Sequence, residues 1–393
     1  MLSKKNLPAA CFLLLIAGFT LWSIFAPKKT FSENENRVLA QKPELNVSAV
    51  LSGQYGLDYE EWLTDQFPAR DRWIALKAWA ERISGRTEIN GVYFGKDGYL
   101  FERFMEGDLD EGLKEKNLDA IADFAGRFGS LLGEDHVRVM LVPSSGAVLK
   151  DKLPAFAQMY DQNRMLSSMQ NKLKEAGIGD AWVDVRPMFE ENADRYIYYR
   201  TDHHWTTLGA FLGYLAWRES LAADSGAGSP YGMRESDYQV KTVSEDFLGT
   251  VYSKVNICLQ KDEIERWDRK SSGHEWTVEY NLGEKVTDTF YEESYLDKKD
   301  KYAYFFDGNQ PLVRIVNHSK PEGSGKLLII KDSFAHCFAP FAAEEFAETH
   351  MVDLRYFRMP LSQYVEGNGI TDVLVLYNTV NLAKDRNMGA LNR

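Results

Sequence analysis

Short apolar runs that alternate with helical patterns are the feature that most constrains the fold of this chain. Three of these runs are HVRVMLV, GKLLIIK and ITDVLVLYN, and AWVDVRPMF and THMVDLRYF read the same way. Each run is long enough for one buried strand and too short for a buried helix. Strands that alternate with helices form parallel βαβ units, so the sequence predicts an α/β fold with a doubly wound sheet.

Length and composition limit the classes of protein to consider. The chain has 393 residues, of which 44% are hydrophobic, so it can bury a large core, as one large domain with insertions or as two domains. Its net charge of −12, without an evident cluster of Lys and Arg, argues against nucleic acid as a partner. Three cysteines, Cys11, Cys258 and Cys337, are too few for a disulfide framework and have no metal-ligand spacing.

The N-terminus carries a long apolar segment. Lys4 and Lys5 precede an almost unbroken apolar run over residues 7–26, and Pro27, Lys28 and Lys29 follow it. About 20 apolar residues cross the hydrocarbon core as a helix. We therefore expect an uncleaved membrane anchor with the rest of the chain outside the cytoplasm. A cleaved signal peptide is the alternative.

The chain between the anchor and the strands divides into several segments. Residues 27–50 are polar and read as a stalk. Two helices broken near Pro68 follow, and then a strand–turn–strand with its turn at residues 96–98. Residues 228–316 are polar and aromatic and are expected to be an insertion or lid. Aromatic side chains there could stack on sugar rings or pack in the core, and core is favoured: Tyr231, Tyr238, Trp276, Tyr280, Tyr302 and Tyr304.

The segment TDHHWTTLGAFLGYLAW carries the first candidate chemistry. Thr206 or Thr207 can cap its helix, which leaves Asp202 and His204 on the preceding loop. A carboxylate two residues from an imidazole can orient the ring and stabilise its protonated form, as a general base requires. The alternatives are an Asp that caps the helix beside surface histidines, and a metal site, although the other histidines are not grouped like ligands.

The segment LLIIKDSF carries the second candidate. Ser333 follows a buried strand, and ligands of open parallel sheets bind at the carboxyl ends of the strands. A serine at this position can act as a nucleophile, with backbone N–H groups near the developing negative charge. The alternative is a serine that caps the next helix. Ser144 and Ser145 have a similar placement without a neighbouring acid, and the sequence has no G-x-S-x-G elbow.

In combination, these segments resemble a known family. FSENENRVLA, DQFPARD, NGVYFGKDGYLF, TDHHWTTLGA, FLGTVYSK and IIKDSF are similar to segments of the DHHW protein family, which is related to the SGNH hydrolase-like proteins of alginate O-acetylation. The resemblance implies an SGNH hydrolase-like parallel sheet flanked by helices, with the acid and base before the nucleophile in the chain. Taken with the N-terminal segment, it gives the expected organisation: residues 1–6 in the cytoplasm, an anchor at 7–26, a stalk at 27–50, and a catalytic domain at 51–393 that contains a mixed β insertion at 228–316.

The resemblance also implies roles for individual residues. Asp202 would be the acid, His204 the base and Ser333 the nucleophile, with His203 as a spacer. Lys331 departs from the pattern, because ordinary SGNH enzymes have Gly before Asp-Ser. Two further candidates follow from the expected topology, since the next strands place Arg355 and Asn378 at the same edge of the sheet. Asn378 is the candidate oxyanion donor and Arg355 a candidate cleft residue, although a strand cap and a surface charge are equally compatible readings.

Together with these features, the resemblance implies an O-acetyltransferase of the cell surface. Ser333 would take an acetyl group from a donor and pass it to a polysaccharide hydroxyl, with no metal or other cofactor. The resemblance implies a membrane-bound acyl-transfer partner that brings the donor to the outer face. A polysaccharide acetyl esterase of the same fold is the first alternative. A non-catalytic polysaccharide-binding scaffold of an export or acetylation complex is the second.

Overall fold

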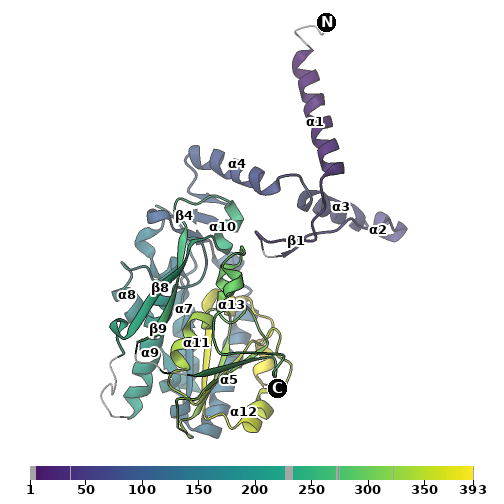
Figure 1. Ribbon diagram of the computed structural model, residues 1–393. Helices are drawn as coiled ribbons and strands as arrows, with labels where there is room; N and C mark the ends of the chain where they lie inside the picture. The colour runs from purple at the N-terminus through teal and green to yellow at the C-terminus, as the bar shows by residue number, and fades with distance from the viewer. Residues whose placement is uncertain are drawn as a thin grey trace. The chain divides into compact units, whose positions relative to one another are not determined.

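The computed structural model describes residues 6–35, 37–225, 233–270, 273, 275–321 and 323–392. The chain forms two compact units (Figure 1). Unit 1 comprises Met1–Asn90 with Tyr252–Ile257, and unit 2 comprises Gly91–Val251 with Cys258–Arg393.

Unit 1 begins with the apolar helix. Its elements in chain order are α1 (Leu7–Phe25), β1 (Phe31–Ser32), β2 (Arg37–Val38), α2 (Val47–Leu51), α3 (Gln54–Asp65), α4 (Arg70–Ile83) and β3 (Glu88–Ile89). Among the described residues, α1 is the one helix long and apolar enough to cross a membrane, and a signal sequence has the same properties. The two helices predicted on either side of Pro68 are confirmed as α3 and α4.

Ion pairs order part of the segment expected to be a stalk. Arg37 donates from both terminal nitrogens to the buried Asp65 carboxylate, at 2.8 and 2.5 Å, and Arg70 pairs with Glu35. The hydrogen bond from Arg37 lowers the pKa of Asp65 despite burial, which alone would raise it. Two of the segments that carried the family resemblance, FSENENRVLA and DQFPARD, therefore bind each other within this unit.

In unit 2, eight strands of the described chain form the central sheet. In spatial order they are β11 (Lys285–Thr287), β10 (Trp276–Tyr280), β12 (Leu312–Asn317), β14 (Glu348–Val352), β13 (Lys326–Lys331), β15 (Asp372–Asn378), β6 (Val137–Val142) and β7 (Trp182–Val183). From β14 to β7 all neighbours are parallel, whereas β12, β10 and β11 are antiparallel. The predicted α/β class and parallel sheet are thus confirmed, and the region 228–316 extends the same sheet at one edge.

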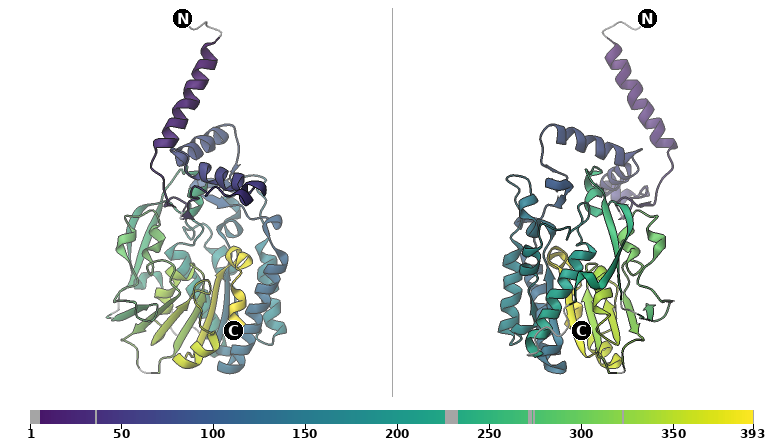
Figure 2. Two further views of the ribbon diagram at one scale, coloured as in Figure 1. Left: turned by 90° about the vertical axis from the view of Figure 1, so that its right-hand side faces the viewer. Right: turned by 60° about the vertical axis from the view of Figure 1, so that its left-hand side comes forward.

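Helices cover both faces of this sheet (Figure 2). Successive side chains of a strand point to opposite faces, and in β15 Val373 and Val375 pack in one core while Leu374 and Leu376 pack in the other. The first core contains helices α5 (Glu111–Leu132), α7 (Gln162–Glu175), α12 (Leu361–Asn368) and α13 (Thr379–Lys384). The second contains α8 (Arg186–Glu191), α9 (Thr207–Ser225) and α11 (Ala335–Ala342).

The remaining elements of unit 2 are hairpins and short helices. β4 (Val92–Phe94) and β5 (Leu100–Glu102) form the predicted strand–turn–strand around residues 96–98. α6 (Ser145–Val148) follows β6, β8 (Tyr238–Phe247) pairs with β9 (Asp262–Arg269) as a two-stranded ribbon, and a 3₁₀ turn spans Lys301–Tyr304. α10 (Thr250–Val255) begins at the end of the first part of unit 2 and continues into the Tyr252–Ile257 segment of unit 1.

Burial shows whether the aromatic side chains of residues 228–316 are free to stack on sugar rings or pack in the core. Tyr238, Tyr280, Tyr302 and Tyr304 lie in the core, and Trp276 packs partly buried against it. Tyr231 lies outside the described residues.

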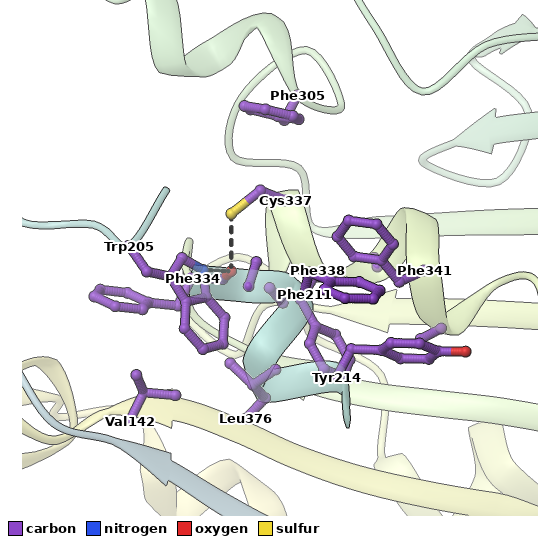
Figure 3. Packing of buried hydrophobic residues seen from close by; sticks show 14 of the residues in the cluster. Val142, Trp205, Phe211, Tyr214, Phe305, Phe334, Cys337, Phe338, Phe341 and Leu376 are labelled. Atoms are coloured by element: carbon purple, nitrogen blue, oxygen red, sulfur yellow. Dashed lines mark hydrogen bonds between the residues drawn. The ribbon is translucent and has the colours of Figure 1, made fainter. Parts of the chain in front are cut away.

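Aromatic side chains join α9 to α11 in the second core (Figure 3). Phe338 of α11 contacts the rings of Trp205, Tyr214 and Trp217, with ring centroids 6.4, 6.3 and 5.8 Å away. Gly213 of α9 leaves room for this packing, because a Cβ there would lie 2.8 Å from the Trp205 ring.

We expect Phe338→Ala to lower the free energy of unfolding by roughly 3–5 kcal/mol, because it removes a fully buried ring and leaves a cavity. Phe156→Ala is the matched control, since that side chain is 100% exposed; a surface change of this kind costs less than about 0.5 kcal/mol. Urea unfolding of the detergent-solubilised chain, followed by tryptophan fluorescence, measures both. Equal effects of the two substitutions would contradict the packing described.

Candidate active site

Ser333 lies in the turn that joins the end of β13 to the start of α11. The turn is fixed by Asp332, whose buried carboxylate accepts hydrogen bonds from the backbone N–H groups of Phe334 and Asn378 at 2.9 and 2.8 Å. The Asn381 side-chain amide donates to the same carboxylate at 2.8 Å. Asp332 therefore connects the ends of two neighbouring parallel strands, β13 and β15, directly beside Ser333.

Asp202 and His204 lie on the loop before α9, as predicted. The loop is closed by a backbone hydrogen bond from Tyr199 N–H to the His204 carbonyl at 3.2 Å. Thr206 caps α9, because its hydroxyl accepts from the backbone N–H of Gly209 at 3.2 Å. The side chains of Asp202 and His204 are both buried. His204 is therefore not a surface histidine, and Asp202 is not a solvent-exposed helix cap.

The structure brings the three predicted residues together. The Nδ1 atom of His204 lies 2.5 Å from Oδ1 of Asp202, and its Nε2 atom lies 2.7 Å from Oγ of Ser333. Both ring nitrogens are thus within hydrogen-bonding distance of a partner, one an acid and the other a hydroxyl. This is the spatial order of a nucleophile, a base and an acid that orients the base.

A segment distant in sequence completes the surroundings of Asp202. The backbone N–H and the hydroxyl of Thr250 donate to its Oδ2 atom at 2.7 and 3.0 Å. Gly249 lies so close that a Cβ at this position would be 2.2 Å from the Asp202 Cβ. The Gly-Thr pair of the FLGTVYSK segment is therefore explained by contact with the acid. The motif is recognisable in the sequence, but no neighbouring residue indicates that it contacts Asp202.

Burial and charge set the protonation of the pair. Burial and the neighbouring His203 lower the pKa of His204 to about 4. The Asp202 carboxylate acts in the opposite direction, but its effect is smaller. Burial alone would raise the pKa of Asp202, but the neighbouring His203 and His204 and the bonds from His204 and Thr250 hold it below its usual value. At neutral pH, His204 is uncharged and Asp202 is ionised. A neutral imidazole can accept a proton from a hydroxyl.

Trp205 connects the loop that carries His204 to the turn that carries Ser333. Its indole Nε1–H donates to the Phe334 carbonyl at 2.9 Å, and the two rings pack with centroids 5.5 Å apart (Figure 3). The residue after His204 is thereby bonded to the residue after Ser333.

Tyr302 contacts both His204 and the turn that carries Ser333. Its ring stacks on the His204 imidazole with centroids 3.8 Å apart and planes at 11°. Its hydroxyl donates to the Ser333 carbonyl at 3.1 Å and lies 3.2 Å from Cys337 Sγ. The sequence predicts Tyr302 as a core residue, but nothing near it in the chain indicates that it stacks on His204.

The two further candidates have defined structural partners. Asn378 donates from Nδ2 to the Val142 carbonyl at 3.0 Å and caps α13 through its Oδ1 atom. Arg355 forms a two-point ion pair with Asp353, at 2.9 and 2.6 Å. Their predicted roles as oxyanion donor and cleft residue stay predictions. The hydrogen bonds of Asn378 fit the alternative of a cap at the end of its strand. Arg355 is close enough for its charge to contribute to the lowered pKa of His204.

Lys331, the departure from the SGNH pattern, is directed into a buried cluster. Its ammonium lies 2.7 Å from His336 Nε2 and 3.5 Å from Asp353 Oδ2. Burial lowers the pKa of Lys331.

The metal alternative involves the same residues. Within the part of the chain that the structure describes, Asp202, His203 and His204 are the one group of potential ligands close enough to share an ion, with ligand atoms within 4.8 Å. Both nitrogens of His204 already face Asp202 and Ser333, and His203 Nδ1 lies 2.7 Å from the Thr250 hydroxyl. A metal would have to replace at least one of these contacts, so the donor set fits a hydrogen-bonded site better.

Comparison with known proteins shows which family model and which folds the chain resembles. Residues 92–256 match the family model described as the SGNH hydrolase-like domain of the acetyltransferase AlgX. The predicted resemblance is confirmed. The matched region contains Asp202, His204 and Thr250, and ends before Ser333.

Individual relatives are similar over different shares of the chain. The alginate biosynthesis protein AlgX of Azotobacter vinelandii is 32% identical over 74 residues, which are 18% of this chain and 15% of that protein. A DHHW family protein from Eubacterium siraeum shares the fold with a TM-score of 0.58 at 22% identity, over 78% of this chain and 96% of its own. PatB1 of Bacillus cereus has a TM-score of 0.58 at 23% identity, over 74% of this chain and 96% of its own.

The environment of His204 leads to a pH-dependent prediction. The folded chain takes up a proton on His204 at about pH 4, whereas the unfolded chain does so near 6.5. Because the unfolded state binds more protons between these values, His204 makes the free energy of unfolding fall as the pH falls from 6.5 to 4. In His204→Gln this part of the pH dependence is expected to disappear.

NMR of ¹⁵N-histidine-labelled protein measures the titration directly, with the His204→Gln spectrum used to assign the signal. A His204 titration close to 6.5 would contradict the buried and charge-opposed imidazole.

Proposed function

We propose that this chain is an extracytoplasmic O-acetyltransferase that acts on a cell-surface or exported polysaccharide through a serine acyl-enzyme. The observation that carries the proposal is the continuous contact from Asp202 through His204 to Ser333, at 2.5 and 2.7 Å. Ser333 is the nucleophile, His204 the base, and Asp202 the acid that orients the imidazole. The match to a domain family named for an acetyltransferase supports acyl transfer as the reaction.

In the first half-reaction, Ser333 Oγ attacks the acetyl carbonyl of the donor ester and its proton passes to His204 Nε2. Asp202 stabilises the imidazolium that forms. The C–O bond of the donor then breaks, and the departing alkoxide takes the proton from His204. An acetyl-serine and a neutral imidazole result, so charge and protons balance.

In the second half-reaction, a polysaccharide hydroxyl gives its proton to His204 and attacks the acetyl-serine. The bond from the acetyl carbon to Ser333 Oγ breaks, and the proton returns to Oγ. Water in place of the sugar would give hydrolysis, so exclusion of water decides between transfer and esterase activity.

Each tetrahedral intermediate carries a negative oxygen that needs hydrogen-bond donors. The backbone N–H of Ser333 is the nearest candidate, because no partner for it is found among the described residues. Asn378 Nδ2 has one N–H left after its bond to Val142, and is the second candidate donor.

The proposed location follows from α1. This helix of 19 residues would be about 28 Å long, close to the thickness of the hydrocarbon core. Anchored in this way, the catalytic residues lie outside the cytoplasm. An acetyl donor made inside the cell would need a membrane-bound acyl-transfer partner to reach them.

We expect Ser333→Ala to lower the hydrolysis of p-nitrophenyl acetate by a factor on the order of 10⁴ to 10⁶, because it removes the attacking oxygen. Asp202→Asn leaves the nucleophile but favours the wrong imidazole tautomer, with a loss on the order of 10⁴. Ser130→Ala on the exposed side of α5 is the matched control and should have full activity.

Activity that survives Ser333→Ala, or that is lost in Ser145→Ala instead, would exclude Ser333 as the nucleophile. Activity lost on chelation would favour the metal alternative.

Transfer itself is tested with a polysaccharide acceptor. With the wild-type chain, we expect acetate release to fall and acetylated oligosaccharide to appear by mass spectrometry as the acceptor concentration rises. An unchanged rate of acetate release without acetylated sugar would identify an esterase. Binding of oligosaccharide without turnover of either kind would identify a scaffold.

A further inference from the structure

Helix α4 of unit 1 exposes an apolar stripe. The exposed fractions are 41% for Trp73, 58% for Leu76, 45% for Trp79 and 82% for Ile83. At 3.6 residues per turn these four side chains fall within an arc of about 120°. Ala78, on the opposite side of the helix, is fully buried. Two tryptophans on an exposed helical stripe are costly in water and therefore point to an apolar surface that covers them.

The charges on α4 indicate which kind of surface this is. The helix contains four basic residues and two acidic ones, in a chain whose net charge is −12. A positively charged helix with Trp, Leu and Ile on one side has the composition of helices that lie in the headgroup region of a bilayer.

Contacts with α1 place the stripe at a definite depth. The Trp73 ring packs on Phe19 of α1 with ring centroids 5.5 Å apart, and Phe67, just before α4, stacks on the same ring at 5.9 Å. Phe19 precedes the end of α1 at Phe25 by six residues, which is about 9 Å along a helix. An interfacial helix buries its apolar side about 5–10 Å into the boundary between headgroups and acyl chains.

The residues around this contact resemble a membrane boundary. Lys28 and Lys29 follow α1 directly, and the Lys28 ammonium lies 5.5 Å from the centre of the Trp62 ring. Tryptophans and lysines gather where a spanning helix leaves the bilayer.

We propose that α4 lies in the outer interface of the membrane, with Trp73, Leu76, Trp79 and Ile83 in contact with lipid. This rests on the proposed insertion of α1 and adds a second attachment, at the membrane surface. The occupant of the stripe is thus a lipid surface that includes anionic headgroups.

Site-directed spin labels on the full chain test this proposal. The chain is reconstituted in liposomes of phosphatidylcholine and anionic phosphatidylglycerol, with Cys258 replaced by Ser and with Cys337 left in place, because its thiol is buried and shielded from the label. Single labels are placed at Leu76→Cys and Ile83→Cys on the stripe, and at Lys77→Cys and Glu81→Cys away from it, each with Cys11→Ala. Collision with oxygen, which concentrates in lipid, is compared with collision with a water-soluble nickel chelate.

We expect the ratio of oxygen to nickel collisions to be several-fold higher at positions 76 and 83 than at 77 and 81. Equal ratios at all four positions would overturn the proposal. Low collision with both reagents at 76 and 83 would also overturn it, because protein rather than lipid would then cover the stripe.

Native Cys11 of α1 is the internal control. Labelled alone in the Cys258→Ser background, it reports whether α1 is inserted. A lipid-exposed Cys11 with water-exposed labels at 76 and 83 removes the α4 proposal and leaves the anchor. A water-exposed Cys11 removes both.

Discussion

The hydrogen bond from Trp205 to the Phe334 carbonyl is the constraint on which the candidate site depends. His204 and Ser333 are 129 residues apart in sequence, and this bond of 2.9 Å joins their two segments one residue beyond each of them. The bond is buried, so its loss would leave an unpaired polar group in the core. Ring packing across α9 and α11 surrounds it. The 2.7 Å approach of imidazole and hydroxyl is therefore set by the rigid core beneath them.

Electrostatics add a second constraint. A fully buried carboxylate is costly unless several donors compensate it. Asp202 accepts a hydrogen bond from the backbone N–H of His204 in its own loop. It also accepts from the backbone N–H and the hydroxyl of Thr250, which lies 48 residues further along the chain. Asp332 is held in the same way by donors from the ends of two strands. Two buried acids thus fix the geometry on either side of Ser333, one through the base and one through the turn.

Much of this arrangement was predictable from sequence, for physical reasons that differ between residues. The strands at Val137, Lys326 and Asp372 were recognised because their apolar runs are continuous, as in any sheet buried on both faces. Parallel topology then requires Ser333 and Asn378 to lie at one edge. The proximity of Asp202 and His204 to that edge followed from family resemblance and not from periodicity.

Other contacts could not be predicted. Thr250 and Tyr302 reach the site from segments whose local patterns carry no information about their partners. The side-chain bonds of Asn378 are equally invisible in sequence, since a polar residue after a strand can cap a helix or face a ligand with the same neighbours. The sequence predicts an insertion at 228–316 and not an extension of the sheet. The antiparallel strands there are short and half-polar, so they do not resemble the continuous apolar runs of the parallel strands.

The stacking of Tyr302 on His204 has a consequence for how such proteins can diverge. Tyr302 belongs to a stretch of chain that is otherwise peripheral to the parallel strands, yet it forms one wall against the imidazole. Exchange of this stretch between homologues would therefore replace part of the surroundings of His204. Point changes around Tyr302 are therefore expected to disturb the imidazole less than grafting of the whole stretch, because a grafted stretch would have to restore the stacked ring.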